Sequence, residues 1–116
     1  MSYKLILVLL CALLLSACMS NNIYYWGSYE STLYSYNKDP NESNLSKHKA
    51  QLEKIIDKAE NSKKRAPPGI YFELGMIEAK LGNIERSIAL LNREKSQFPE
   101  AQLYVDKAIA RLEANS

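Results

Sequence analysis

The sequence predicts an all-α protein, a stack of antiparallel helical hairpins with about five helices after an N-terminal apolar segment. Three observations predict this class. From Leu45 onward, apolar residues recur at spacings of three and four, the period of an amphipathic helix. Proline and glycine interrupt this pattern at residues 67–69, Gly82 and Pro99, and divide it into segments of ordinary helix length. Only residues 23–26 have a competing interpretation as an alternating strand.

The N-terminal segment has the layout of a secretory signal peptide. Residues 1–4 are polar with one positive charge, and residues 5–15 form an apolar run that is too short to span a bilayer as a helix. The sequence Leu15-Ser16-Ala17-Cys18 resembles the lipobox of bacterial lipoproteins. The resemblance implies cleavage after residue 17, linkage of Cys18 to diacylglycerol, and acylation of the new amino terminus. The alternative is an ordinary secreted protein with a cysteine at its cleavage site.

Composition limits the class of protein that would remain after cleavage. Removal of residues 1–17 leaves 99 of the 116 residues, enough for one small domain. Cys11 is lost with the leader and Cys18 carries lipid, so the domain has no disulfide and depends on its apolar core. The formal charge falls from +2 to +1 because the leader contains Lys4 and no acidic residue. The balanced charge argues against nucleic acid as a partner.

The lipobox resemblance also implies a location. Two or more acyl chains anchor a protein stably to a membrane. In Gram-negative lipoproteins, an aspartate after the lipidated cysteine typically signals retention at the inner membrane, and here that residue is Met19. The resemblance therefore implies the periplasmic face of the outer membrane, with the periplasmic face of the inner membrane as the alternative.

A short tether, residues 18–23, leads to the predicted domain, residues 24–116, which begins with a crowd of aromatic residues. Trp26, Tyr29, Leu33 and Tyr36 follow helical spacing, which predicts a short helix over residues 28–37. This spacing also places Trp26 and Tyr29 on the structural side, with Tyr25 and Tyr34 nearer the surface.

The aromatic residues are the candidate recognition surface, since tyrosine and tryptophan supply large, stiff contact area and are enriched at interface hot spots. The candidates for partner binding are Tyr24, Tyr25, Trp26, Tyr29 and Tyr34. Two alternatives stay open: these rings cover the first hairpin as part of the core, or they lie against lipid headgroups.

Residues 40–62 are predicted to form the longest helix. Asp39 is the predicted N-cap, Pro40 the first helical residue, and Glu42 the partner in a capping box. The predicted apolar stripe consists of Leu45, Leu52, Ile55, Ile56 and Ala59. The cations Lys63, Lys64 and Arg65 follow the helix, where the macrodipole favours positive charge, and they have a second interpretation as contacts to anionic headgroups or an acidic partner.

Three further helices are predicted, over residues 70–81, 84–97 and 100–114. Residues 67–69 precede the first, Gly82-Asn83 forms the turn after it, and Pro99 ends the second. The residues expected to point inward from the last helix are Leu103, Val105, Ala108, Ile109 and Leu112.

Residues 68–99 resemble a tetratricopeptide repeat, a helical hairpin of 34 residues. The positions that match are Tyr71, Leu74, Gly75, Gly82, Leu91 and Pro99; the departures are Glu78 at an aromatic position and Ser87 and Glu94 at alanine positions. The resemblance implies close helix packing at Gly75, a divergent first repeat formed by the two upstream helices, and a capping role for the last helix. An irregular small helical bundle is the alternative.

A closer resemblance covers most of the predicted domain. The segments that carry it are Tyr25-Trp26-Gly27-Ser28-Tyr29-Glu30, Leu33-Tyr34, Lys38-Asp39-Pro40 and Pro67-Pro68-Gly69-Ile70-Tyr71. They look like an uncharacterised family of short bacterial lipoproteins, often found beside lipoproteins related to the curli secretion channel. The resemblance implies a part in an envelope-spanning assembly, with another envelope protein, such as a curli-channel-type lipoprotein, as partner.

Catalytic and metal-binding patterns are absent from the sequence. It has no phosphate-binding glycine loop, nucleophile elbow or paired-cysteine motif. His48 is the single histidine and is interpreted as an ordinary helix-face residue, while Glu53 and Asp57 are interpreted as solvated charges. We therefore expect no enzymatic activity, no metal and no cofactor. The expected function is a non-enzymatic scaffold in the cell envelope; the alternative is a periplasmic module that binds glycan or peptidoglycan through its Tyr/Trp cluster.

Overall fold

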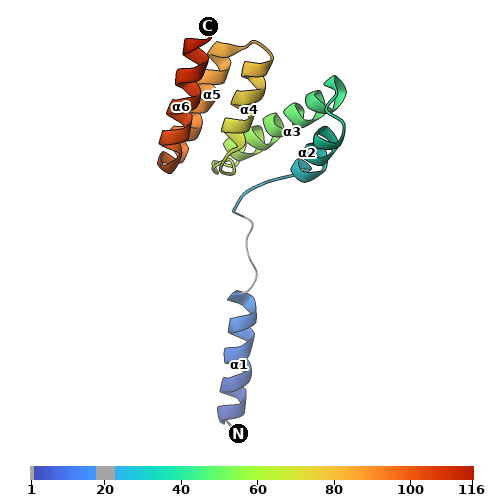
Figure 1. Ribbon diagram of the computed structural model, residues 1–116. Helices are drawn as coiled ribbons and strands as arrows, with labels where there is room; N and C mark the ends of the chain where they lie inside the picture. The colour runs from blue at the N-terminus through green and yellow to red at the C-terminus, as the bar shows by residue number, and fades with distance from the viewer. Residues whose placement is uncertain (1, 18–22) are drawn as a thin grey trace.

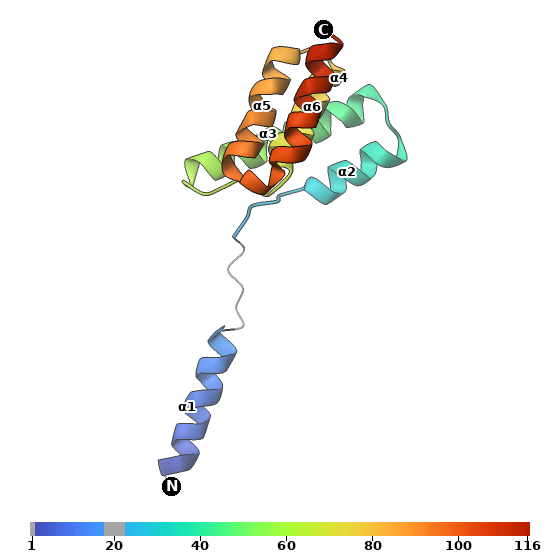
Figure 2. The same cartoon turned by 60° about the vertical axis from the view of Figure 1, so that its left-hand side comes forward.

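The computed structural model describes the backbone of residues 2–17 and 23–116, and the side chains of residues 2–11 and 23–116. Within these residues all regular structure is helical, as predicted. The elements are α1 (Ser2–Ala17), α2 (Tyr29–Lys38), α3 (Glu42–Asn61), α4 (Ile70–Lys80), α5 (Ile84–Gln97), the 3-10 turn η1 (Pro99–Ala101) and α6 (Gln102–Ala114). From α2 onward each helix packs against the next; α2 pairs with α3, and α4, α5 and α6 lie side by side (Figures 1 and 2).

Helix α1 coincides with most of the predicted leader. The large apolar side chains of residues 5–10 are exposed and take no part in the core of the stack. No helix in the described part of the chain combines the length and apolar character needed to cross a membrane. Residues 18–22, which include Cys18, Met19 and all of the tether except Ile23, lie outside the described residues, so cleavage and lipidation remain predictions.

The predicted helices form with small shifts at their ends. The expected helix over residues 28–37 is α2, and the expected helix over residues 84–97 is α5. The last helix, α6, begins later than predicted because a 3-10 turn starts at Pro99 and precedes it. Proline has no backbone N–H to donate, so α5 ends before Pro99. Residues 23–26 do not form the alternative strand.

The predicted cap of α3 is wrong. Asp39 ends α2, and its backbone N–H donates to the carbonyl of Ser35 at 3.0 Å. Asn41 is the N-cap of α3, where its side-chain oxygen accepts from the N–H of Asn44 at 2.8 Å. Helix α2 ends at Lys38, so the turn between the two helices needs both Asp39 and Pro40. The N-cap of α3 is therefore the next residue with a suitable side chain, Asn41.

The core has two parts. The larger part lies between α3 and α4 and includes Leu52, Ile55 and Leu74. The smaller part joins α5 to α6 through Leu91, Phe98, Ala101 and Val105. Leu103, predicted to point inward, is instead 70% exposed. Since α6 is the end of the stack and only one of its faces meets α5, residues on the opposite face stay in solvent.

Gly75 lies where α4 and α5 touch. A Cβ at this position would be 3.2 Å from Leu91 Cγ and 3.2 Å from the carbonyl oxygen of Ser87. The close approach expected at Gly75 is therefore present. The expected turn at Gly82 is also present, with a left-handed backbone conformation at φ +90° that glycine adopts without strain.

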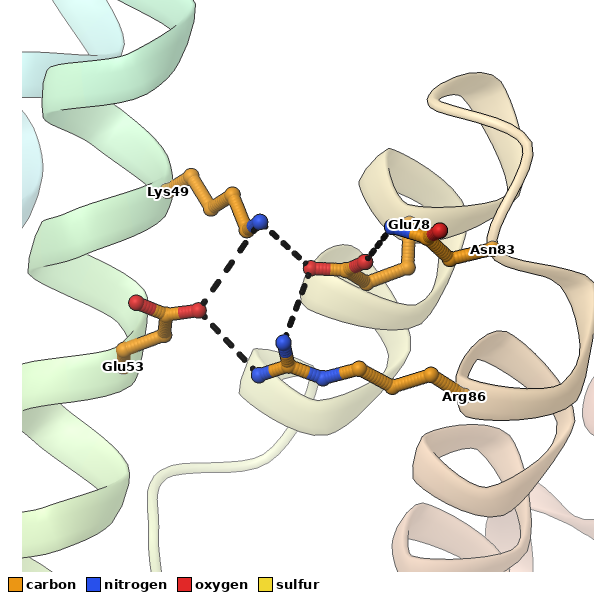
Figure 3. A network of polar contacts seen from close by, with 5 residues as sticks. All are labelled: Lys49, Glu53, Glu78, Asn83 and Arg86. Atoms are coloured by element: carbon orange, nitrogen blue, oxygen red, sulfur yellow. Dashed lines mark hydrogen bonds and ion pairs between the residues drawn. The ribbon is translucent and has the colours of Figure 1, made fainter.

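All three departures from the repeat pattern, Glu78, Ser87 and Glu94, are fully buried. Figure 3 shows Glu78 at the centre of a polar network that joins α3, α4 and the start of α5. Its carboxylate lies 2.8 Å from Lys49 Nζ and accepts a hydrogen bond of 2.7 Å from the Asn83 side chain. Burial acts to raise the pKa of Glu78, but the bonds from Lys49 and Asn83 and the charges of Lys49 and Arg86 outweigh it and lower the pKa.

Glu53 belongs to the same network. Its carboxylate lies 3.1 Å from the Arg86 guanidinium and 4.0 Å from Lys49 Nζ. Glu53 is 38% exposed and its partner Arg86 is 51% exposed, so the pair lies at the surface, and it connects α3 to α5 across 33 positions of the chain.

Glu94 replaces a missing helix cap. The N-cap of α4 is Gly69, which has no side chain to accept from the first turn. Glu94 on α5 accepts instead from the Gly69 N–H at 2.6 Å. Burial raises the pKa of the Glu94 carboxyl, and hydrogen bonding from the backbone of residues 69, 71 and 72 only partly opposes the rise.

The raised pKa of Glu94 predicts a pH dependence of stability. The folded chain holds this proton more tightly than the unfolded chain, so the contribution of Glu94 is largest below its ordinary pKa of about 4.5 and is lost as the pH rises through the higher folded value. Glu94→Gln should remove this loss. Urea unfolding at several pH values should show the variant gaining free energy of unfolding, relative to wild type, as the pH rises above about 4.5. A difference that is constant with pH would contradict the raised pKa.

Candidate interaction surface

The structure divides the predicted aromatic candidates into two groups. Tyr25, Trp26 and Tyr34 are 40%, 43% and 66% exposed. Tyr24 and Tyr29 are half-buried. The exposure of Trp26 corrects the expectation that it lies on the structural side with Tyr29. Helix α2 begins only at Tyr29, so Trp26 precedes the helix. The helical spacing between Trp26 and Tyr29 therefore does not place the two side chains on one face.

Tyr29 is fixed to the stack by a polar network. Its hydroxyl donates to Glu73 Oε2 at 2.6 Å, and the other oxygen of Glu73 lies 2.5 Å from Nε2 of His48. Nδ1 of His48 lies 2.8 Å from the Thr32 hydroxyl. The Thr32 hydroxyl also donates to the carbonyl oxygen of Tyr29 at 3.1 Å, so both nitrogens of the His48 ring have partners within the same network. The network therefore connects both ends of a helical turn of α2 to α3 and α4.

His48 is 1% exposed. Its interpretation as an ordinary helix-face residue is therefore wrong, because Thr32 and Glu73 come from distant positions to satisfy both ring nitrogens. Burial, the hydrogen bond to Glu73 and the Glu73 charge together raise the pKa of Tyr29, so its hydroxyl stays protonated and remains a donor. The Tyr29 ring also packs edge-on against Trp26, with 5.3 Å between centroids.

A cleft of about 530 Å³ lies beside the exposed rings, within the size range of small-molecule sites. One wall is formed by Tyr24, Tyr25 and Trp26, and the other by Lys58, Lys64 and Arg65. We call it the basic–aromatic cleft. Figures 1 and 2 show residues 23–28 running beside the turn between α3 and α4, which brings the two walls together.

The basic wall is built by the end of α3. The N–H of Lys64 donates to the carbonyl of Ala59 at 2.9 Å, and the N–H of Lys63 donates to that of Glu60 at 3.1 Å. This pair of bonds is a Schellman motif, with Lys63 in the left-handed conformation at φ 54°. The motif reverses the chain, and Arg65 then lies with its guanidinium carbon 5.9 Å from the centre of the Phe98 ring.

The described residues contain no group of three or more histidine, cysteine or acidic side chains placed to hold a metal ion. The polar clusters that sequence reasoning missed, around Glu73 and Glu78, connect helices to one another. For the second cluster, the signal that could have found it is Glu78 at an aromatic position of the repeat pattern; Glu73 has no comparable signal in the sequence.

Comparison with known families matches residues 23–108 to a family described as Domain of unknown function (DUF4810). The chain belongs to this family. The matched residues begin with the aromatic segment and end in α6, so the family domain is the helical stack. No curated protein and no solved structure matches the chain.

Proposed function

We propose that this member of the DUF4810 family is a membrane-anchored lipoprotein that acts as a non-enzymatic interaction scaffold or assembly factor in the bacterial cell envelope. One observation carries the proposal: Tyr25, Trp26 and Tyr34 are exposed at the start of a firmly packed helical domain. Protein interfaces are rich in aromatic side chains. When such side chains stand on a rigid domain, little conformational entropy is lost on binding a partner.

The anchor in this proposal is Cys18, in the lipobox-like sequence Leu15-Ser16-Ala17-Cys18. We place the protein at the periplasmic face of the outer membrane because Met19 follows the cysteine. The proposed scaffold is tetratricopeptide-like: α4 and α5 form one repeat, α2 and α3 a divergent one, and α6 the cap. The close contact at Gly75 and the turn at Gly82 support this assignment.

The proposed partner is another envelope protein, and the family resemblance favours a lipoprotein of the curli-channel type. The aromatic wall of the cleft supports a second candidate partner, a glycan or peptidoglycan fragment stacked on Tyr25 or Trp26. Sedimentation of the protein with purified peptidoglycan, compared with capture of envelope proteins from a detergent extract, separates the two candidates.

The combined change Tyr25→Ala and Tyr34→Ala tests the interaction surface. We expect the affinity for the captured partner to fall by more than about 2 kcal/mol, or roughly 30-fold, with little change in melting temperature because both rings are exposed. Leu103→Ala is the matched control, since Leu103 is the most exposed apolar residue of α6. Equal capture of the partner by the double variant and by wild type would reject this surface.

A further inference from the structure

We propose that the basic–aromatic cleft binds the phosphate of an anionic phospholipid headgroup and so orients the domain on the membrane that carries its anchor. The proposal rests on the anchoring proposed above and adds a ligand and a site to it. The site consists of the cationic side chains of Lys58, Lys64 and Arg65 facing the rings of Tyr24, Tyr25 and Trp26 across one cleft.

The charge of the cleft favours an anion. Within the part of the chain that the structure describes, no carboxylate lies within 4.0 Å of Lys58, Lys64 or Arg65. Glu60, the nearest acid before the Schellman motif, is paired instead with Arg93 at 3.0 Å. The C-terminus of α3 contributes about half a negative charge, which three cations outweigh. The cleft therefore has an excess of positive charge, and none of the described residues that line it carries a negative charge.

The chemistry of both walls matches a lipid headgroup. Ammonium and guanidinium groups are the usual protein ligands of phosphate. Tyrosine and tryptophan favour the interface between headgroups and acyl chains, because each has an apolar ring and a polar tip. A flat, purely basic surface would suit a soluble polyanion equally well, but the aromatic wall adds a preference for a ligand at the membrane surface.

The position of the cleft in the chain makes the membrane the nearest source of phosphate. Ile23, at the edge of the cleft, follows Cys18 by five residues. Five residues span at most about 17 Å, so an anchored chain holds the cleft close to the headgroups. Ile23 itself is 72% exposed, so beside the cleft it offers an apolar side chain for contact with the membrane surface.

Trp26 is the single tryptophan of the chain, so its fluorescence reports on the cleft directly. The full lipidated protein is reconstituted into nanodiscs of phosphatidylcholine alone and of phosphatidylcholine with phosphatidylglycerol. We expect Trp26 emission to move to shorter wavelength as the phosphatidylglycerol content rises. The double change Lys64→Glu and Arg65→Glu should weaken this response at least about tenfold. The matched control is Lys47→Glu with Lys54→Glu, on exposed positions of α3 outside the cleft.

Each result decides the proposal. A response that the cleft variant loses and the control variant keeps supports it. No response to phosphatidylglycerol, or equal loss in both variants, overturns it, since equal loss indicates only general charge attraction. A response to soluble glycerol phosphate in discs without anionic lipid, with none to phosphatidylglycerol, assigns the cleft to a soluble ligand and also overturns it. The discs contain no partner protein, so failure of the proposed scaffold function is measured separately, by capture with the Tyr25 and Tyr34 variant.

Discussion

Glu73→Ala should lower the free energy of unfolding by about 2–4 kcal/mol. The substitution leaves Nε2 of the buried His48 without its acceptor and removes the acceptor of the Tyr29 hydroxyl. An unsatisfied buried polar group costs about 1–3 kcal/mol, and a hydrogen bond to a charged group contributes about 1.5–3 kcal/mol. We expect less than the sum of the upper limits because the Glu73 side chain is 27% exposed and water replaces part of the lost interaction.

Urea unfolding followed by circular dichroism measures this effect, and two variants control it. Glu73→Gln keeps an acceptor for His48 and an amide that bonds to Tyr29, so it should cost less than Glu73→Ala. Glu85→Ala removes an exposed glutamate that makes no hydrogen bond or ion pair with the described residues and should change stability by no more than about 0.5 kcal/mol. If Glu73→Ala behaves like Glu85→Ala, the network does not hold α2 to the stack.

The Glu73→Ala variant also tests whether the polar network orders the aromatic side chains of the proposed interaction surface. Trp26 packs against Tyr29, so release of Tyr29 from Glu73 should also free Trp26. We expect Trp26 emission to move to longer wavelength in Glu73→Ala under conditions where the domain is still folded. This result would show that the polar network beneath α2 orders the aromatic side chains above it.

Cys18→Ser should abolish lipid attachment completely. In the lipoproteins that this segment resembles, acylation of the cysteine thiol precedes cleavage, so the variant should accumulate as an uncleaved or mislocalised precursor. Labelling of cells with an alkyne fatty acid, followed by electrophoresis, measures both the lipid and the size of the product. Cys11→Ser is the matched control because Cys11 lies within the predicted leader and should not affect labelling. Equal label in Cys18→Ser and wild type would reject the lipoprotein proposal.

The helices and most of their limits could be predicted from the sequence because the signals are local. Helical spacing of apolar residues identified α2, α3 and α5, and proline or glycine marked the turns at residues 67–69, Gly82 and Pro99. The left-handed backbone at Gly82 and the tight contact at Gly75 also follow from the residue type itself. The cap of α3 was misassigned, since two acceptable N-cap residues lie two positions apart and the end of α2 decides between them.

The candidate surface could be predicted only in part. The crowd of aromatic residues was visible, but which rings are exposed depends on where α2 begins and on Glu73. The basic wall of the cleft was visible as a charge run at the end of α3. Its position opposite Tyr24, Tyr25 and Trp26 was not, because those residues lie more than 30 positions away in the chain.

By itself the sequence determined the all-α class, the number of helices in the stack and membership of the family. Each of these depends on residue type and on spacing within a few turns. Only the tertiary structure decided the roles of His48, Glu78 and Glu94, which are buried between helices, and of the half-buried Glu73. The physical reason is that burial of a polar group is stable only when a partner meets it, and here each partner comes from a helix brought alongside by the fold.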